Sequence, residues 1–252
     1  MLTLDLIVLC LAAFCAGFVD SLVGGGGLIQ LPAMMMSLPN VPLVTILGTN
    51  KMVSILGTAT ATYRYSQQIK FVGRIAIPAV ISALIFSALG AWTITLVDPD
   101  ILKPLFLILL FGVFILTLIN KTMGMNQELV TSVPLWKTIL IGSVMGFYDG
   151  FFGPGAGTYL VLAFVGVLGM TFVQGSAYAK LVNLSTNFAA VIFFIIKGHF
   201  LLEVAIPMMV FNIFGAILGV RLALLRGNGF IRIILRLVVV GMLIRFGFEI
   251  LN

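Results

Sequence analysis

Long runs of apolar residues are the feature that most constrains this chain. A run of about 20 apolar residues is the length that crosses a bilayer as a helix. The runs fall at about 4–23, 42–63, 75–97, 101–120, 138–152, 172–196, 202–225 and 230–251. Only 9% of the 252 residues are charged and 61% are hydrophobic, whereas roughly a quarter of the residues in soluble domains are charged. The sequence therefore excludes a soluble fold and predicts an all-α, polytopic membrane protein.

Two shorter apolar stretches, 28–38 and 157–169, directly follow glycine clusters. The clusters read DSLVGGGG at 20–27 and DGFFGPGAG at 149–157. Apolar segments of 10–14 residues are often re-entrant, and helix-breaking sequence at membrane depth is tolerated only inside protein or beside a watery cavity. We therefore expect glycine-tipped re-entrant or broken helices here. Hairpins and pairs of full spans both remain open for 4–40 and 138–170.

The chain repeats itself at a fixed offset of 129 residues (149 − 20 = 129). We call the residue 129 positions later the mate of the earlier one. Leucines can match by chance in two apolar sequences, but Asp, Lys, Pro and Gly at one offset indicate a real repeat. The mated pairs include Gly17 and Gly146, Asp20 and Asp149, Gly24 and Gly153, Lys51 and Lys180, Pro78 and Pro207, and Gly90 and Gly219. We expect two repeats of about four segments, 1–120 and 138–252, joined by a linker at 121–137.

The loop charges indicate that the two repeats face opposite ways. The connection 64–74 holds three basic residues and no acidic one, and the region 221–236 holds four arginines and no acidic residue. Their mates, around 197–203 and 98–103, are weakly charged. Because Lys and Arg gather in cytoplasmic loops, we expect inverted repeats, with a cytoplasmic linker and both termini external. The same rule explains the net charge of +6, so no nucleic-acid partner is expected.

The glycine clusters predict a binding site. A short helix is expected after each cluster, and a helix N-terminus carries free N–H groups and a positive dipole end that suit an anion. Inverted symmetry would bring two such ends towards the membrane centre. The alternative is that the glycines only allow close helix packing. The substrate-binding residues expected in the clusters are Gly24, Gly25, Gly26, Gly27, Gly153, Gly155, Ala156 and Gly157.

Lys51 and Lys180 each lie about nine residues inside an apolar segment. Ionisable residues within membrane spans are expensive and mark functional sites. Contact with an anionic substrate, a structural ion pair with Asp20 or Asp149, and proton handling all remain open. The two aspartates would repel an anion, so we expect them to orient the site or to carry a coupling proton. Neutral polar residues complete the set, with Asn50 and Asn183 as substrate-binding residues and Thr49, Ser54, Tyr178, Ser185 and Asn187 near them.

Sequence motifs for catalysis or for a metal are missing. The single histidine, His199, has no second ligand at metal-site spacing, and no Walker, Ser/His/Asp or CxxC motif occurs. An enzyme that acts within the membrane would need a nucleophile beside a base. We therefore expect no metal, no cofactor and no enzymatic activity, and an intramembrane enzyme or assembly subunit is the weakest of the interpretations.

Two stretches resemble the signatures of the TauE/SafE family of sulfite and organosulfur anion exporters. The first is AGFVDSLVGGGGL at 16–28 with GTNK at 48–51, and the second is GFYDGFFGPGAG at 146–157 with AKLVN at 179–183. The resemblance covers essentially the whole chain and is to the small bacterial members. It implies a bacterial inner-membrane location and transport of small sulfur-containing anions such as sulfite or sulfoacetate. One departure is that the mate of Asn50 is Ala179, so a symmetric Asn pair is absent.

The leading functional hypothesis is a secondary transporter that works by alternating access at a site near the membrane midplane. Its expected partners are a small anionic substrate, the lipid bilayer and, as a candidate coupling ion, protons. An anion channel of the same architecture is the alternative, and it would need a continuous pore and weak binding.

Overall fold

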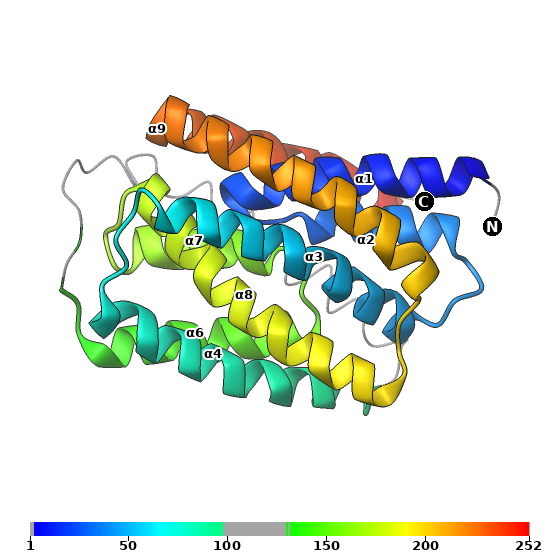
Figure 1. Ribbon diagram of the computed structural model, residues 1–252, viewed down its shortest axis with the longest axis horizontal. Coiled ribbons are helices and arrows are strands. Elements are labelled where there is room, and N and C mark those ends of the chain that lie inside the picture. The colour runs from blue at the N-terminus through cyan, green and yellow to red at the C-terminus, as the bar shows by residue number, and fades with distance from the viewer. Residues whose placement is uncertain (1–2, 98–129, 131, 252) are drawn as a thin grey trace.

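The computed structural model describes residues 3–97, 130 and 132–251, and all the regular structure within these residues is helical. The helices are α1 (Thr3–Val23), α2 (Gly27–Ser37), α3 (Leu43–Ser66), α4 (Gly73–Ile94), α6 (Leu135–Phe151), α7 (Ala156–Gly166), α8 (Phe172–Lys197) and α9 (Leu202–Leu251). They run roughly along the long axis of the molecule (Figure 1). The predicted all-α fold is confirmed for this part of the chain. The predicted segment 101–120 and residues 121–129 and 131 of the linker 121–137 lie outside the described residues.

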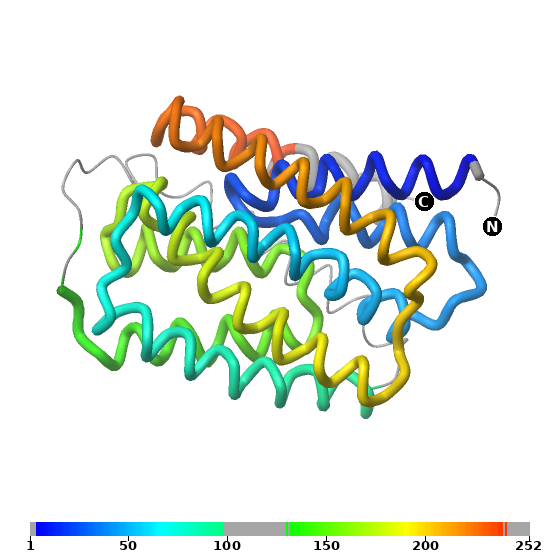
Figure 2. Tube along the Cα trace, in the orientation of Figure 1, coloured from blue at the N-terminus to red at the C-terminus, as the bar shows by residue number. Residues whose placement is uncertain are grey.

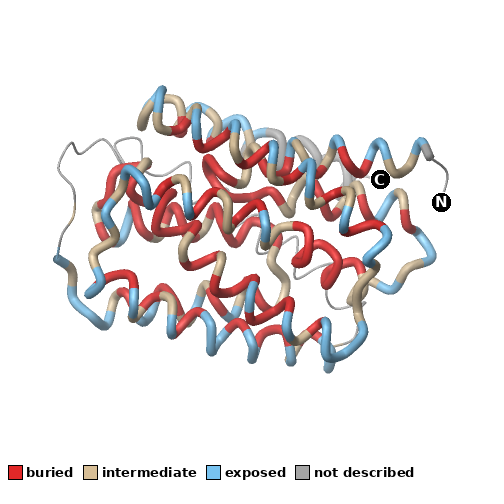
Figure 3. Tube along the Cα trace, viewed as in Figure 1, coloured by how far each residue is buried: buried red, intermediate tan, exposed pale blue. Residues whose placement is uncertain are grey.

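Four of the described helices are long and apolar enough to cross a membrane. They cover Leu4–Val23, Gly73–Ile94, Phe172–Lys197 and Leu202–Val238. Large apolar side chains are exposed along the outward faces of these helices, including Leu11, Ile81, Ile192 and Phe214, while the buried residues gather inside (Figure 3). An apolar exterior of this extent suits lipid rather than water. The prediction of a polytopic membrane protein is therefore confirmed.

Helix ends follow ordinary capping rules. At the start of α8 the hydroxyl of Thr171 accepts a hydrogen bond from the backbone N–H of Gln174 at 3.1 Å, as N-cap threonines do. The same helix ends at Gly198, which has φ 71°. The predicted segments 202–225 and 230–251 form one element, α9, which is interrupted at Gly227 with φ 66° and ψ −160°. Glycine adopts this conformation without steric strain, and it divides α9 where the sequence predicts two segments.

The glycine clusters join a long helix to a short one. Positive φ angles occur at Gly24 and Gly25 between α1 and α2, and at Gly153 and Gly155 between α6 and α7. The short helices α2 and α7 have 11 residues each, about 16 Å at 1.5 Å per residue, which is roughly half of the hydrocarbon thickness. In each pair the short helix turns back along the long one (Figure 1) and is too short to cross a membrane by itself.

The helices obey the 129-residue offset of the sequence. The starts of α2, α3 and α4 are residues 27, 43 and 73, and those of α7, α8 and α9 are residues 156, 172 and 202, each 129 residues later. Helices related in this way run in opposite directions in the ribbon and in the Cα trace (Figures 1 and 2). For example, α3 runs from right to left and α8 from left to right.

The most extensive helix contacts cross between the sequence halves. Helix α1 packs on α9, and α6 packs on α4, while α3 and α8 lie between these pairs (Figure 1). Glycines allow the close approach: a Cβ at Gly17 would lie 2.2 Å from the carbonyl oxygen of Asn212, and a Cβ at Gly146 would lie 2.5 Å from that of Ala83. Both pairs are mated, since 17 + 129 = 146 and 83 + 129 = 212.

The buried apolar side chains form two clusters, one towards each end of the molecule. One cluster surrounds the α3–α4 and α7–α8 connections, and the other surrounds the α2–α3 and α8–α9 connections. Along α1, Asp20 falls between Ala13 of the second cluster and Leu22 of the first.

Substituting the mated glycines Gly90 and Gly219 should destabilise the fold through packing alone. A Cβ at Gly90 would lie 2.2 Å from the carbonyl oxygen of Phe147, and one at Gly219 would lie 2.5 Å from that of Phe18. Overpacking of this kind costs about 1–3 kcal/mol. We expect Gly90→Ala and Gly219→Ala each to lower the melting temperature in detergent.

Gly229→Ala is the control, because nothing lies within 4 Å of a Cβ at Gly229. It should leave the melting temperature unchanged or raise it. Equal melting temperatures for Gly90→Ala, Gly219→Ala and Gly229→Ala would contradict the close helix crossings at Gly90 and Gly219.

Candidate functional site

Two ion pairs join the sequence halves in the interior. The Nζ atom of Lys51 on α3 lies 2.6 Å from Oδ1 of Asp149 on α6, and that of Lys180 on α8 lies 2.6 Å from Oδ2 of Asp20 on α1. Each lysine therefore binds the aspartate of the other half. The four formal charges cancel, so the empty site is neutral. This arrangement matches the ion-pair alternative left open by the sequence.

The pair of Lys51 and Asp149 is enclosed by further hydrogen bonds. Lys51 Nζ also donates to Asn187 Oδ1 at 3.1 Å, and the hydroxyl of Thr186 donates to Oδ2 of Asp149. Asn187 in turn donates to Asn183 Oδ1 at 2.7 Å. Both oxygens of Asp149 therefore have strong partners, and its side chain is only 3% exposed.

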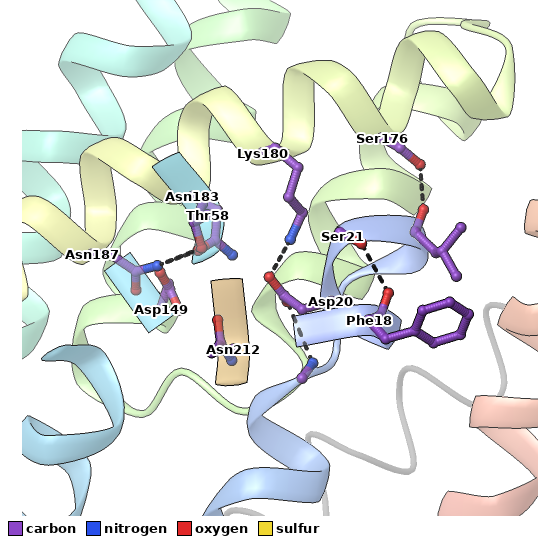
Figure 4. Close-up of polar contacts among 12 residues, drawn as sticks. Phe18, Asp20, Ser21, Thr58, Asp149, Ser176, Lys180, Asn183, Asn187 and Asn212 are labelled. Carbon is purple, nitrogen blue, oxygen red and sulfur yellow. Dashed lines mark hydrogen bonds and ion pairs between the residues drawn. The ribbon is translucent and has the colours of Figure 1, made fainter. Parts of the chain in front are cut away.

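The pair of Lys180 and Asp20 has fewer partners. Figure 4 shows Lys180 reaching from α8 to Asp20. Within the described residues, the second oxygen of Asp20 accepts only the backbone N–H of Gly26, at 3.4 Å. The side chain of Asp20 is 20% exposed, while that of Lys180 is fully buried. The two mated aspartates thus lie in unequal surroundings.

A cavity of about 20 Å³ lies between the two hairpin joints. A volume of this size holds about one water molecule. Its lining consists of Asp20, Gly25, Gly27, Asn50, Lys51, Ser54, Asp149, Gly153, Gly155, Gly157, Asn183 and Asn187. The structure therefore brings to one cavity ten of the fourteen residues expected to bind substrate or orient the site, together with Ser54 and Asn187, which were expected near them.

Several polar groups at this cavity lack hydrogen-bond partners among the described residues. The backbone N–H groups of Gly27 and Gly157, at the first turns of α2 and α7, have none. The buried Oδ1 atom of Asn50 also has none. The arrangement presents an ammonium group, two backbone N–H groups and amides to one small space. Such a set of donors can bind an anion.

Four of the expected site residues do not line the cavity. Gly24 lies behind it, where a Cβ would come within 2.0 Å of the carbonyl carbon of Gly157. Gly26 contacts Asp20 through its N–H group, and Ala156 is buried at the start of α7. Lys180 is separated from the cavity and reaches it only through its ion pair with Asp20. Gly24 and Ala156 therefore lie outside the cavity lining.

Three neutral polar residues singled out in the sequence lie elsewhere. The hydroxyl of Thr49 accepts the N–H of Leu201 at 3.0 Å, and that of Tyr178 accepts the N–H of Val72 at 2.6 Å. The hydroxyl of Ser185 donates to a carbonyl of its own helix. These groups hold connections or satisfy the backbone.

Other polar residues near the cavity were missed by the sequence analysis. Thr186 binds Asp149, and Thr58 accepts a hydrogen bond of 3.4 Å from its own mate, Asn187. Asn212 donates to Gln30 Oε1 at 3.3 Å. A usable signal was present for Thr58, because it and its mate Asn187 are both polar and interrupt both apolar repeats at one position; the mates of Thr186 and Asn212 are Gly57 and Ala83, so these two residues give no such signal.

A family model described as sulfite exporter TauE/SafE matches residues 9–246. The chain belongs to the TauE/SafE family. The resemblance found in the sequence is thereby confirmed, and the chain is a membrane transporter of this family and not an enzyme.

Relatives of the TauE/SafE chain cover nearly its full length. A probable membrane transporter protein, ORF9, of Sinorhizobium sp. is 32% identical over 93% of this chain and 89% of its own. A probable membrane transporter protein of Haemophilus influenzae is 34% identical over 90% of this chain and 88% of its own length. The probable membrane transporter protein YfcA of Escherichia coli K12 is 32% identical over 89% of this chain and 83% of its own length. No solved structure matches the chain.

Removing one lysine should destabilise the protein unequally at the two ion pairs. Lys51→Met leaves Asp149 charged and buried, which costs about 3–5 kcal/mol. Lys180→Met leaves Asp20, which is 20% exposed and can be hydrated, so its cost should be smaller. The melting temperature of each variant in detergent, compared with that of the wild type, measures these two losses of stability.

Two controls accompany these variants. Lys51→Met combined with Asp149→Leu removes both charges and should recover most of the stability, while Lys70→Met on the exposed α3–α4 connection should change the stability by less than about 0.5 kcal/mol. Equal stability of Lys51→Met and the wild type would rule out the buried pair.

Proposed function

We propose that this TauE/SafE protein is a secondary transporter of small sulfur-containing anions, such as sulfite or sulfoacetate, and that it works by alternating access. One observation carries the proposal: a small cavity between two hairpin joints is lined by a buried ammonium group and by backbone N–H groups that have no protein partner among the described residues. The sulfite exporter description of the family supports the substrate class.

The donors at the cavity match the oxygens of a sulfur oxyanion. An ammonium group has three N–H bonds, and Lys51 uses two of them for Asp149 and Asn187. The third is free for the substrate. The N–H groups of Gly27 and Gly157 come from helix starts, whose positive dipole ends favour negative charge. Asn50 and Asn183 add amide donors. We assign substrate binding to these residues.

The transport model requires two inverted repeats, 1–120 and 138–252. Three features support this division: the equal offset of the helix starts, the opposite directions of related helices (Figure 1), and the ion pairs that exchange partners between the halves. In inverted-repeat transporters the substrate lies between the repeats, and one repeat rocks against the other.

Alternating access requires the cavity to open, because an oxyanion of several heavy atoms is larger than one water molecule. Two mated hydrogen bonds hold the ends of the molecule: the N–H of Leu201 donates to Thr49 at one end, and that of Val72 donates to Tyr178 at the other. A hollow of about 550 Å³ lies between the α2–α3 and α8–α9 connections at the first end, and we propose it as the entrance. The aromatic rings of Phe71 and Tyr178 pack at 5.1 Å at the other.

We further propose that the protein lies in the bacterial inner membrane with both termini outside. The basic α3–α4 connection lies at the same end of the molecule as the start of α6 and the bend of α9 (Figure 1). This end would face the cytoplasm by the positive-inside rule. The opposite end carries Asp5 and Glu203 beside the hollow.

Binding of sulfur oxyanions to the purified protein tests the function. We expect sulfite, sulfoacetate or methanesulfonate to raise the melting temperature in detergent relative to equal chloride, because a ligand of the native state stabilises it by about 2.7 kcal/mol at 100 times Kd. Gly27→Val should weaken this binding at least tenfold, because the side chain enters the cavity. It should fold normally, since a Cβ at Gly27 would lie 3.4 Å from its nearest neighbour, Pro154.

Gly229→Val supplies the matched control, since its Cβ meets no atom within 4 Å, and it should bind as the wild type does. Unchanged binding by Gly27→Val would mean that the cavity is not the site. No stabilisation by any of these anions would contradict the proposed function. Saturable uptake into proteoliposomes supports the carrier, whereas single-channel currents would support the channel alternative.

The proposed orientation predicts which side of the membrane reaches each loop. In a background with Cys10 and Cys15 replaced by Ala, Lys70→Cys should react with an impermeant maleimide only from the cytoplasmic side. Lys197→Cys should react only from outside. Both positions are exposed, so access is set by the membrane alone. Labelling of Lys70→Cys from outside intact cells would overturn the inverted arrangement.

A further inference from the structure

The two mated aspartates differ in how fully the protein satisfies their charge. Asp149 has a lysine on one oxygen and the Thr186 hydroxyl on the other, and it is 3% exposed. Asp20 has a lysine on one oxygen and only a 3.4 Å contact with the Gly26 N–H on the other. Asp20 is also 20% exposed and lines the cavity. Its second oxygen is therefore the carboxylate oxygen most open to a new partner.

The sequence builds this difference into the repeat. The residue that binds the second oxygen of Asp149 is Thr186, and the position of the first half that corresponds to it (186 − 129 = 57) is Gly57. No hydroxyl is available there. The space is taken by the amide of Asn212, since a Cβ at Gly57 would lie 1.9 Å from Asn212 Oδ1. At the position that corresponds to Asn212 (212 − 129 = 83) the chain has Ala83, so the second half has room for the threonine.

We propose that Asp20 is the proton site of the transport cycle, that Asp149 stays ionised, and that each monovalent anion binds together with one proton on Asp20. The inference rests on the proposed function. In the empty site two lysines balance two aspartates. In the loaded site the same two lysines balance Asp149 and the anion, while Asp20 is a neutral acid. The site is neutral in both states, so no uncompensated charge is buried.

The proton comes from the solution on the side to which the site is open, and it is released on the side where the anion leaves. Protonation removes the negative charge that would repel the substrate beside Lys51. It also leaves Lys180 hydrogen-bonded to a neutral carboxyl group, which lies between Lys180 and the cavity, so that the anion balances the positive charge of Lys180 across that group. A protonated carboxyl group gains one O–H donor, which can face the anion in the cavity.

The groups around Asp20 are consistent with this role. The charged or titratable groups that face it are Lys180 on α8, Tyr65 on α3 and, across the cavity, Lys51 on α3 and Asp149 on α6. Helix α2 has no ionisable residue. At its close crossings with α1, helix α9 presents the uncharged residues Asn212, Gly215 and Gly219, and the one titratable residue of α7, Tyr159, packs edge-to-face on Tyr148 with ring centroids 5.3 Å apart. Lys180 is thus the only direct ionic partner of Asp20 within the described residues.

Proton uptake measured during anion binding tests the proposal. The probe is methanesulfonate or the larger isethionate, because neither anion titrates near neutral pH. Isothermal titration calorimetry in two buffers of different protonation enthalpy gives the number of protons bound. We expect about one proton per anion for the wild-type protein. At alkaline pH the affinity should fall about tenfold per pH unit, as linkage to one proton requires.

Asp20→Asn imitates the protonated acid, so it should bind the anion with no proton uptake and with an affinity that does not change with pH. Asp149→Asn is the matched control: where it folds and binds, uptake should remain at about one proton. Uptake that persists in Asp20→Asn, or that disappears only in Asp149→Asn, would overturn the assignment.

A second variant tests the proposal without removing Asp20. Gly57→Thr combined with Asn212→Ala copies the second-half residues Thr186 and Ala83 into the first half. It should give Asp20 the hydroxyl partner that Asp149 has, so anion-linked proton uptake should require a more acidic pH. Unchanged pH dependence in a folded variant would contradict the argument. Anion binding by the wild type without proton uptake would contradict this inference alone, whereas absence of any anion binding would contradict the proposed function as well.

Discussion

Two lysine ammonium groups in the interior of an apolar bundle impose the strongest constraint on this structure. A buried ammonium group without a counter-ion is too unfavourable to persist, so each lysine requires a carboxylate at contact distance. The chain supplies each carboxylate from the opposite half, Asp149 for Lys51 and Asp20 for Lys180. Because both aspartates lie in the last turns of α1 and α6, this requirement brings the ends of both long arms to the centre.

The glycines follow from that meeting of the two arms. Once the ends of α1 and α6 are held beside α8 and α3, the chain must turn back within a few residues. The two turns also press against each other, as the approach of Gly24 to Gly157 demonstrates. Larger side chains at this contact would push the two turns apart, and each short helix would then lie farther from the ion pairs. Small residues therefore keep the backbone N–H groups of α2 and α7 close to the charges.

Much of this arrangement follows from the sequence. Hydropathy predicts the long helices, and the offset of 129 residues predicts that Asp20 and Asp149, or Lys51 and Lys180, occupy equivalent places. The exchange of partners between the halves does not follow, because a repeat pattern is the same whether each aspartate binds its own lysine or the other one. The positions of Thr49 and Tyr178 were also beyond prediction, since a hydroxyl in an apolar helix can serve a ligand or a neighbouring backbone N–H equally well.

The unequal surroundings of the two aspartates have a similar origin. Pattern matching draws attention to residues that are the same in both halves, but the difference lies at Gly57, whose counterpart is Thr186, and at Asn212, which fills the resulting space. Both identities are visible in the sequence. Their meaning depends on the packing of α9 against α1 and α3, which no local pattern contains.

The packing of α1 on α9 and of α6 on α4 determines when, during synthesis, these helices can reach their native partners. A hydrogen bond such as that from Asn212 to the carbonyl of Ala13 joins residues 199 positions apart, so the first helix enters the bilayer long before its partner has been synthesised. Loops of this size are slow to close. During that interval α1 faces lipid and other chains with Asp20 unpaired. The native packing of α1 on α9 therefore forms only after the ribosome has delivered α9.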